Sequence, residues 1–203
     1  MFLNRILIKL VLLFLLFIGL DSCAPAPLKN LEKQKLQESI ILNSPIQFNK
    51  SGQANYRCKI EAFDQLITGV LIFKKVEQDI RVVMITDFGL KVMDVSLFKD
   101  GSYQVNYMMK HLDYKFVRES FSLNLMMLLE KEIAADTYIY QKENTKLFLD
   151  HKMIYYLENN EIFKVERYRG KNKLMAIAEI QKSANIDIQQ LNPKMRMALS
   201  PIE

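Results

Sequence analysis

A two-residue alternation of apolar and polar side chains constrains the fold more than any other feature of the sequence. Tyr56, Cys58, Ile60 and Ala62 alternate with polar residues, a pattern typical of a strand with one buried face. The tail after residue 193 is either irregular or a last strand. Further strands are predicted at 66–76, 79–86, 90–98, 102–108, 137–142, 145–149, 152–158, 161–168, 172–181 and 185–190.

The connections between these strands are short and rich in turn residues. Segments 86–89 (TDFG), 99–101 (KDG) and 159–160 (NN) separate neighbouring strands. A parallel crossover needs about a dozen residues or more, so such links favour antiparallel neighbours. An open sheet of about 10 strands usually curls or splits. The sequence therefore predicts a mainly β (α+β) fold with a single large curved antiparallel sheet of about 10–11 strands.

Two segments show helical spacing of apolar residues. In residues 113–132 they recur at intervals of four, four and three, which predicts a strongly hydrophobic helix covering the concave side of the sheet. Residues 28–42 predict a second, N-terminal helix from leucine and isoleucine pairs at the same spacing. The residues that define the first helix are Val117, Phe121, Leu125 and Leu128.

The N-terminus has the parts of an export signal. Arg5 and Lys9 supply positive charge, and an unbroken apolar run follows at 10–20. This run is short for a membrane-spanning helix, which needs about 20 residues. The tetrad LDSC at 20–23 resembles the lipobox of bacterial lipoproteins, and that resemblance implies cleavage and lipidation at Cys23. An uncleaved signal anchor is the alternative.

These features divide the chain into three parts. We expect a lipoprotein signal peptide at 1–22, a lipidated tether at 23–28 and one domain at 29–203, a length that suits a single domain. Ala24 follows the cysteine, which favours the periplasmic face of the outer membrane over inner-membrane retention. The net charge is +5, but basic residues alternate with acidic ones, so no nucleic-acid partner is expected.

No catalytic or metal-binding pattern is present in the sequence. The six glycines are too scattered for a phosphate-binding loop, and His111 and His151 are isolated. Cys58 is expected to act as a small buried hydrophobic residue. Acid pairs such as Asp94 with Asp100 are interpreted as solvated charges. We therefore expect no enzymatic activity, no cofactor and no metal.

One strand–turn–strand segment resembles a known family. The sequence RVVMITDFG at 81–89, with the returning strand at 90–94, resembles the R-L-L-L-T-N-P-L-G-S segment of the LolB family of outer-membrane lipoprotein receptors. Gly69 opens a G-x-L element in the preceding strand. The resemblance, which extends to the wider LolA/LolB-like superfamily, implies an incomplete half-barrel closed by helices around an apolar cavity for acyl chains.

The same resemblance implies how such a protein would work. It would accept acylated lipoproteins or lipids, with a soluble periplasmic carrier protein as a further partner, and insert them into the outer membrane. Phe88 takes the place of an exposed leucine that assists release in the family, whereas Asp87 replaces a proline. Met-rich walls would adapt to an acyl chain. The expected lining residues are Met84, Met93, Phe121, Leu125, Met126 and Leu128.

A second function is compatible with the same scaffold. The chain would then be a structural or accessory envelope lipoprotein that holds a protein partner. The two functions differ in the volume of the cavity, because in the accessory role the helix at 113–132 would pack the sheet shut. A gap large enough for an acyl chain favours lipid handling, whereas a core filled by the helix favours the accessory role.

Cys23→Ala is expected to abolish lipidation, because the cysteine directly follows the export signal. Metabolic labelling with palmitate, followed by membrane fractionation, measures this. Cys58→Ala is the control and should keep the label. A Cys23→Ala chain that still carries palmitate would contradict the assignment.

Overall fold

The computed structural model describes residues 26–170 and 172–202. The chain forms two compact units, Met1–Asn30 and Leu31–Glu203. In the first, the described residues include one short 3-10 helix, η1 (Ala26–Leu28). The predicted signal peptide and Cys23 lie outside the described residues. Every described strand belongs to the second unit.

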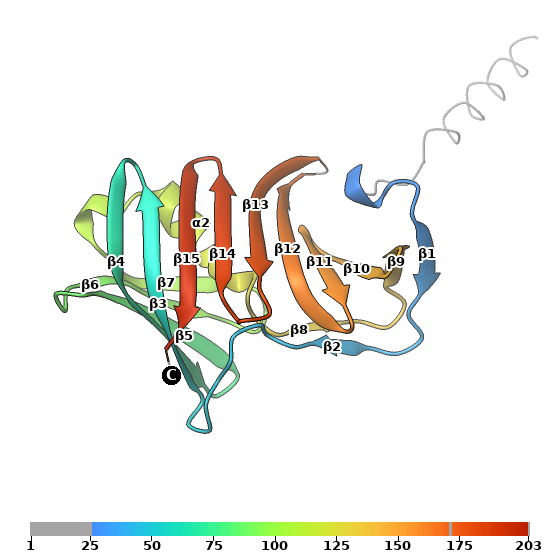
Figure 1. Cartoon of the computed structure of the whole chain (residues 1–203), viewed down its shortest axis with the longest axis horizontal. Coiled ribbons are helices and arrows are strands. Elements are labelled where there is room, and N and C mark those ends of the chain that lie inside the picture. The colour runs from blue at the N-terminus through green and yellow to red at the C-terminus, as the bar shows by residue number, and fades with distance from the viewer. Residues whose placement is uncertain (1–25, 171, 203) are drawn as a thin grey trace, which may run out of the picture. The chain divides into compact units, whose positions relative to one another are not determined.

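Thirteen strands form one antiparallel sheet, in the order β1-β9-β10-β11-β12-β13-β14-β15-β3-β4-β5-β6-β7 (Figure 1). The edge strands β1 and β7 do not pair with each other within the described part of the chain, so the sheet is open. A separate two-stranded sheet pairs β2 with β8. The bounds are β1 (Glu32–Lys35), β2 (Ile40–Leu42), β3 (Gln53–Ala62), β4 (Gln65–Val76), β5 (Asp79–Thr86), β6 (Lys91–Leu97), β7 (Tyr103–Met108), β8 (Lys131–Ile133), β9 (Tyr138–Lys142), β10 (Thr145–Asp150), β11 (Met153–Glu158), β12 (Glu161–Arg169), β13 (Lys173–Ile180), β14 (Ile186–Leu191) and β15 (Lys194–Pro201).

The prediction of one large antiparallel sheet is confirmed, but the predicted number of strands is too low. Every predicted strand corresponds to one of β3–β7 or β9–β14. The tail after Pro193 is a strand, β15, which pairs with β14 on one side and β3 on the other. It thereby joins two meanders into one sheet. The remaining addition, β1, extends the opposite edge.

The predicted N-terminal helix over 28–42 is wrong. This segment instead contains β1, which pairs with β9, and β2, which pairs with β8. Between them the Leu36 N–H donates to the Thr137 carbonyl at 2.9 Å. Helical spacing of a few apolar residues is a weak signal. Pairing with strands about a hundred residues away satisfies the backbone hydrogen bonds and overrides it.

The second predicted helix is present but shorter than 113–132. It is α2 (Lys115–Met126), preceded by a short 3-10 helix, η2 (Lys110–Leu112). After Met126 the backbone tightens, and the Ser44 hydroxyl donates to the Leu128 carbonyl at 2.6 Å. This bond satisfies one of the carbonyls that a helix end leaves free. The chain then enters β8 at Lys131.

α2 lies on one side of the sheet, behind β4 and β15 in the view of Figure 1. Its stripe of Val117, Phe121 and Leu125 is at most 1% exposed. The helix contacts β6 and β7 and also β14, although four strands lie between β14 and β6 in the sheet order. One helix can reach both groups only if the sheet curves around it, so α2 lies on the concave side.

Cys58 is fully buried on β3, as predicted. Burial raises the pKa of its thiol to about 12. The thiol therefore stays protonated at neutral pH and is a poor nucleophile. Its neighbours across the sheet include Gly69, where an added Cβ would lie 2.0 Å from the Ile85 carbonyl oxygen. Glycine at this position allows β4 and β5 to approach closely.

Asp94 is not a solvated charge, as the sequence had suggested, but a buried cross-link between strands. It is 2% exposed. Arg81 donates to both carboxylate oxygens at 2.9 and 2.8 Å, and Lys91 and Asn106 donate at 3.3 and 3.2 Å. The hydrogen bonds from Arg81 are the main reason why the pKa of Asp94 falls from 3.8 to about 2. The network ties β5, β6 and β7 together.

Asp94→Asn is expected to lower the free energy of unfolding at pH 7 by about 2 kcal/mol, since each unit of pKa shift corresponds to about 1.4 kcal/mol. The folded-state pKa is depressed, so this stabilisation is complete above about pH 4 and is lost as the pH falls toward about 2. Urea unfolding at pH 7 and near pH 2.5 measures the difference. Asp64→Asn, in the exposed β3–β4 turn, is the control. An equal loss in Asp94→Asn at both pH values would contradict this account.

Candidate functional site

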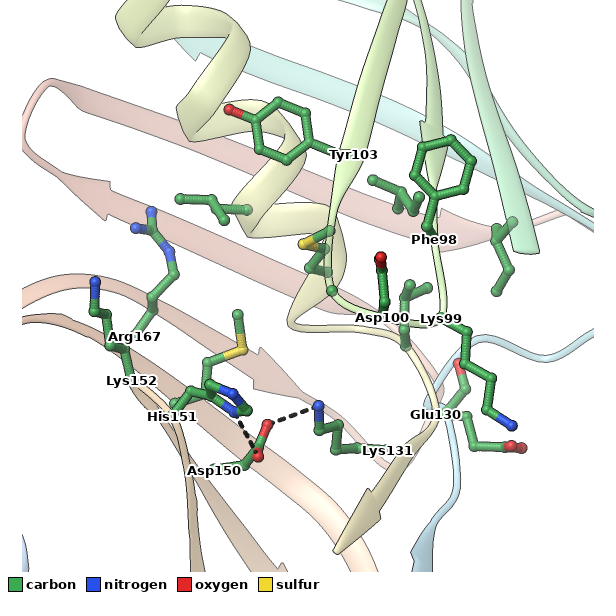
Figure 2. A pocket seen from close by; sticks show the side chains of 18 of the residues that line it. Phe98, Lys99, Asp100, Tyr103, Glu130, Lys131, Asp150, His151, Lys152 and Arg167 are labelled. Atoms are coloured by element: carbon green, nitrogen blue, oxygen red, sulfur yellow. Dashed lines mark hydrogen bonds and ion pairs between the residues drawn. The ribbon is translucent and has the colours of Figure 1, made fainter. Parts of the chain in front are cut away.

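A groove of about 1350 Å³ lies on the helix side of the sheet (Figure 2). It is bounded by α2, by the β4–β5 and β6–β7 turns, and by strands β11, β12 and β14. Ordinary small-molecule pockets have about 300–1,000 Å³. This space, which we call the helix-side groove, is therefore large enough for an extended ligand.

α2 contributes different faces to the core and to the groove. Val117, Phe121 and Leu125 pack into the core. The adjacent face follows the spacing of three and four residues that places side chains on one side of a helix. It presents an apolar wall with one carboxylate and one hydroxyl to the groove. Its residues are Phe116, Glu119, Ser120, Leu123 and Met126.

Of the six predicted lining residues, only Met126 lines the groove. The other five are fully buried and fill the core between α2 and the sheet. Apolar spacing identifies buried residues but does not show which side of a helix faces a cavity. The two methionines that replace them in the lining, Met153 and Met175, lie on β11 and β13. The five core residues are Met84, Met93, Phe121, Leu125 and Leu128.

Charged side chains line the groove unevenly. At the β10–β11 turn, Asp150 pairs with Lys131 at 2.8 Å and His151 at 2.8 Å, as the dashed lines in Figure 2 show. Lys152 and Arg169 beside this turn form no ion pair with any described residue. Elsewhere in the lining, acidic residues are interspersed with lysines. They include Glu77, Asp79, Asp100, Glu130 and Glu132.

Arg167 is the groove residue that the sequence reasoning missed. It lies on β12 and is only 7% exposed. Its Nη2 donates to Asn124 Oδ1 at 3.0 Å and to Gln190 Oε1 at 2.7 Å. No carboxylate among the described residues lies within 4.0 Å of the guanidinium. Burial lowers the pKa of Arg167, an effect that the negative charge of Glu119 opposes.

The sheet register explains how Arg167 reaches these partners. Met153, Arg167, Ala176 and Gln190 are direct neighbours in one row across β11, β12, β13 and β14. Ala176 is small, so the arginine side chain can extend over it toward Gln190. The strand pattern in the sequence could have indicated that Arg167 faces inward. Arg167 follows the buried Val165 by two residues, and such residues share a face of a strand.

Phe88 stands at the tip of the β5–β6 turn and is 93% exposed. The preceding Asp87 accepts hydrogen bonds from Arg57 Nη1 and Thr68 Oγ1, both at 2.6 Å. The Gly89 N–H closes the turn onto the Thr86 carbonyl at 2.9 Å. Asp87 therefore fastens this turn to β3 and β4.

An exposed aromatic cluster lies at one end of the helix-side groove. Phe63, from the β3–β4 turn, meets Phe116 edge to face with ring centres 5.9 Å apart. Tyr114 stacks on Phe116 at 5.8 Å. Phe116 belongs to both the cluster and the groove lining, so the two features are continuous.

No group of three or more His, Cys, Asp or Glu side chains within 26–170 and 172–202 is arranged to hold a metal ion. Over the same residues, no helix has the length and apolar character needed to cross a membrane.

Comparisons with known proteins give a distant likeness of fold. Neither protein-family models nor curated proteins match the chain. A domain from Vibrio parahaemolyticus named as an outer membrane lipoprotein-sorting protein superimposes with a TM-score of 0.42 and 7% identity, covering 77% of this chain and 86% of that one. A DUF1329 family protein from Desulfovibrio piger ATCC 29098 gives 0.41 and 6%, covering 76% and 85%. Neither likeness is close enough to assign a function.

Proposed function

We propose that this chain is a membrane-anchored, non-enzymatic protein that holds acylated cargo, a lipid or a lipoprotein, in the helix-side groove and releases it into the outer membrane. The observation that carries the proposal is the groove itself. It remains open although α2 fills the concave side beneath it. One wall is the apolar face of α2 that contains Leu123 and Met126.

The groove suits cargo that must be both held and released. Burying apolar surface stabilises a bound chain by about 25 cal/mol per Å². In a fully enclosed site the whole chain would be buried, so it would bind tightly and dissociate slowly. The helix-side groove is not fully enclosed, and three methionines in its lining, Met126, Met153 and Met175, provide flexible contacts. A carrier of this kind needs no catalytic group.

Phe88 fits the releasing step of the proposed function. A large apolar side chain that is almost fully exposed has no role in the core of this fold. Leu90, at the other end of the same turn, is also exposed. Hydrophobic residues at a rigid tip can enter the interface of a bilayer, where aromatic side chains are favoured. The hydrogen bonds of Asp87 would hold the tip in place during this contact.

The accessory role remains the second candidate, and the exposed aromatic cluster favours it. Aromatic residues are enriched in protein–protein interfaces. If Phe63, Tyr114 and Phe116 bind a protein partner, crosslinking in the intact envelope should capture one protein through this cluster. Phe63→Ser would then abolish the crosslink without affecting acyl binding in the groove.

Leu123→Glu is expected to weaken binding of a fluorescent acyl probe by about ten-fold or more, because it places a carboxylate on the apolar wall. Titration of the purified protein measures the affinity. Leu66→Glu, at an exposed leucine of β4 outside the groove lining, is the matched control and should bind as the wild type does. If both variants bind the probe equally well, the groove is excluded as the site of acyl binding.

Phe88→Asp is expected to leave stability within about 0.5 kcal/mol of the wild type, since the side chain is exposed. Binding of the acyl probe should also persist. Transfer of the bound probe to anionic liposomes should slow several-fold, because the variant tip carries a charge into the interface. Leu66→Asp is again the control. A normal transfer rate in Phe88→Asp would exclude this residue from release.

A further inference from the structure

Around Arg167, which lines the helix-side groove, several hydrogen-bond donors have no acceptor among the described residues. Arg167 Nε and Asn124 Nδ2 are enclosed and have no hydrogen-bond partner among the described residues. Arg167 Nη1 also donates to none of them, but unlike Nε it is not enclosed. A guanidinium and an amide supply donors that only an acceptor can satisfy. Of these three donors, Nη1 is the one that an acceptor in the groove can reach, and a negatively charged oxygen would suit it best.

The local charge points in the same direction. Arg167 is more than nine-tenths buried and has no counter-ion within 4.0 Å in the described part of the chain. Lys152 joins it across the sheet, since the Tyr168 N–H donates to the Lys152 carbonyl at 2.7 Å. Figure 2 shows the two side chains, Lys152 from the β10–β11 turn and Arg167 from β12, extending in the same direction, and both line the pocket. Of the carboxylates in the lining, Asp150 is already paired with Lys131, and Glu119 acts on Arg167 without forming an ion pair with it.

We propose that Arg167 and Lys152 form an oxyanion-binding subsite of the helix-side groove, which takes the carboxylate or phosphate headgroup of an amphiphile whose acyl chain lies along α2. This inference rests on the proposed lipid-handling function and makes it more specific. Asn124 belongs to α2, the helix that carries Leu123 and Met126. The headgroup subsite and the apolar wall are therefore joined through one element, with the charge bound to Nη1 and the chain on the helix.

The test compares two ligands with the same chain and different heads. The full chain carrying Cys23→Ala is titrated with palmitate and with hexadecanol at low salt, so that its own lipid does not compete. Palmitate should bind at least about ten-fold more tightly, as expected for a charge-assisted hydrogen bond in a protected site. Arg167→Met should remove this preference and leave hexadecanol binding unchanged. Arg196→Met, an exposed arginine on β15 outside the groove, should keep the preference.

The other results of these titrations would overturn the subsite, the proposed function or the amphiphilic ligand. Equal binding of palmitate and hexadecanol by the wild type overturns the subsite but leaves the proposed function standing. Binding of neither ligand overturns the proposed function and the subsite with it. If inorganic phosphate binds as tightly as palmitate, the subsite binds free anions, and the proposal of an amphiphilic ligand is overturned.

Arg167→Lys keeps the positive charge and is the test variant if Arg167→Met does not fold. It should lower the palmitate preference several-fold, because lysine lacks the planar fork of donors. An unchanged preference in either folded variant overturns the proposal.

Discussion

The pairing of β15 with β3 is the contact on which the rest of the structure depends. It joins the meander of β9–β14 to the meander of β3–β7, in a register that runs from Met195 opposite Ala62 to Pro201 opposite Tyr56. The two strands are among the most distant in the sequence. Their pairing is what brings β14, and with it Gln190, to the same helix that packs on β6 and β7. Without it the concave side of the sheet would not exist.

α2 is the second constraint on the structure, because one of its faces packs into the core and the adjacent face lines the groove. One face closes the core with Val117, Phe121 and Leu125. The adjacent face leaves a groove whose far wall is made by β11, β12 and β14. The lipid-handling and accessory functions had seemed to require either an open gap or a filled core. The structure has both, since the filled core lies under the helix and the groove lies beside it.

Periodicity in the sequence was sufficient for the strands with strong alternation, such as β3, and for the buried stripe of α2. It failed where pairing partners decide the structure. The segment of β1 and β2 has helical spacing, yet it pairs with β9 and β8. Local pattern also cannot distinguish lining residues from core residues, so Met84 and Met93 were predicted to line a cavity but lie in the core. Arg167 was missed because its partners, Asn124 and Gln190, are on elements far away in the sequence.

If the proposed function is correct, an acyl chain occupies the helix-side groove along α2. Photo-crosslinking with a diazirine-labelled fatty acid, followed by peptide mapping, locates the bound chain. We expect crosslinks on the groove face of α2, at Leu123 and Met126, and on β11 near Met153. Crosslinks confined to the opposite face of the sheet, for example around Phe163 on β12, or no saturable crosslink at all, would contradict the proposed function.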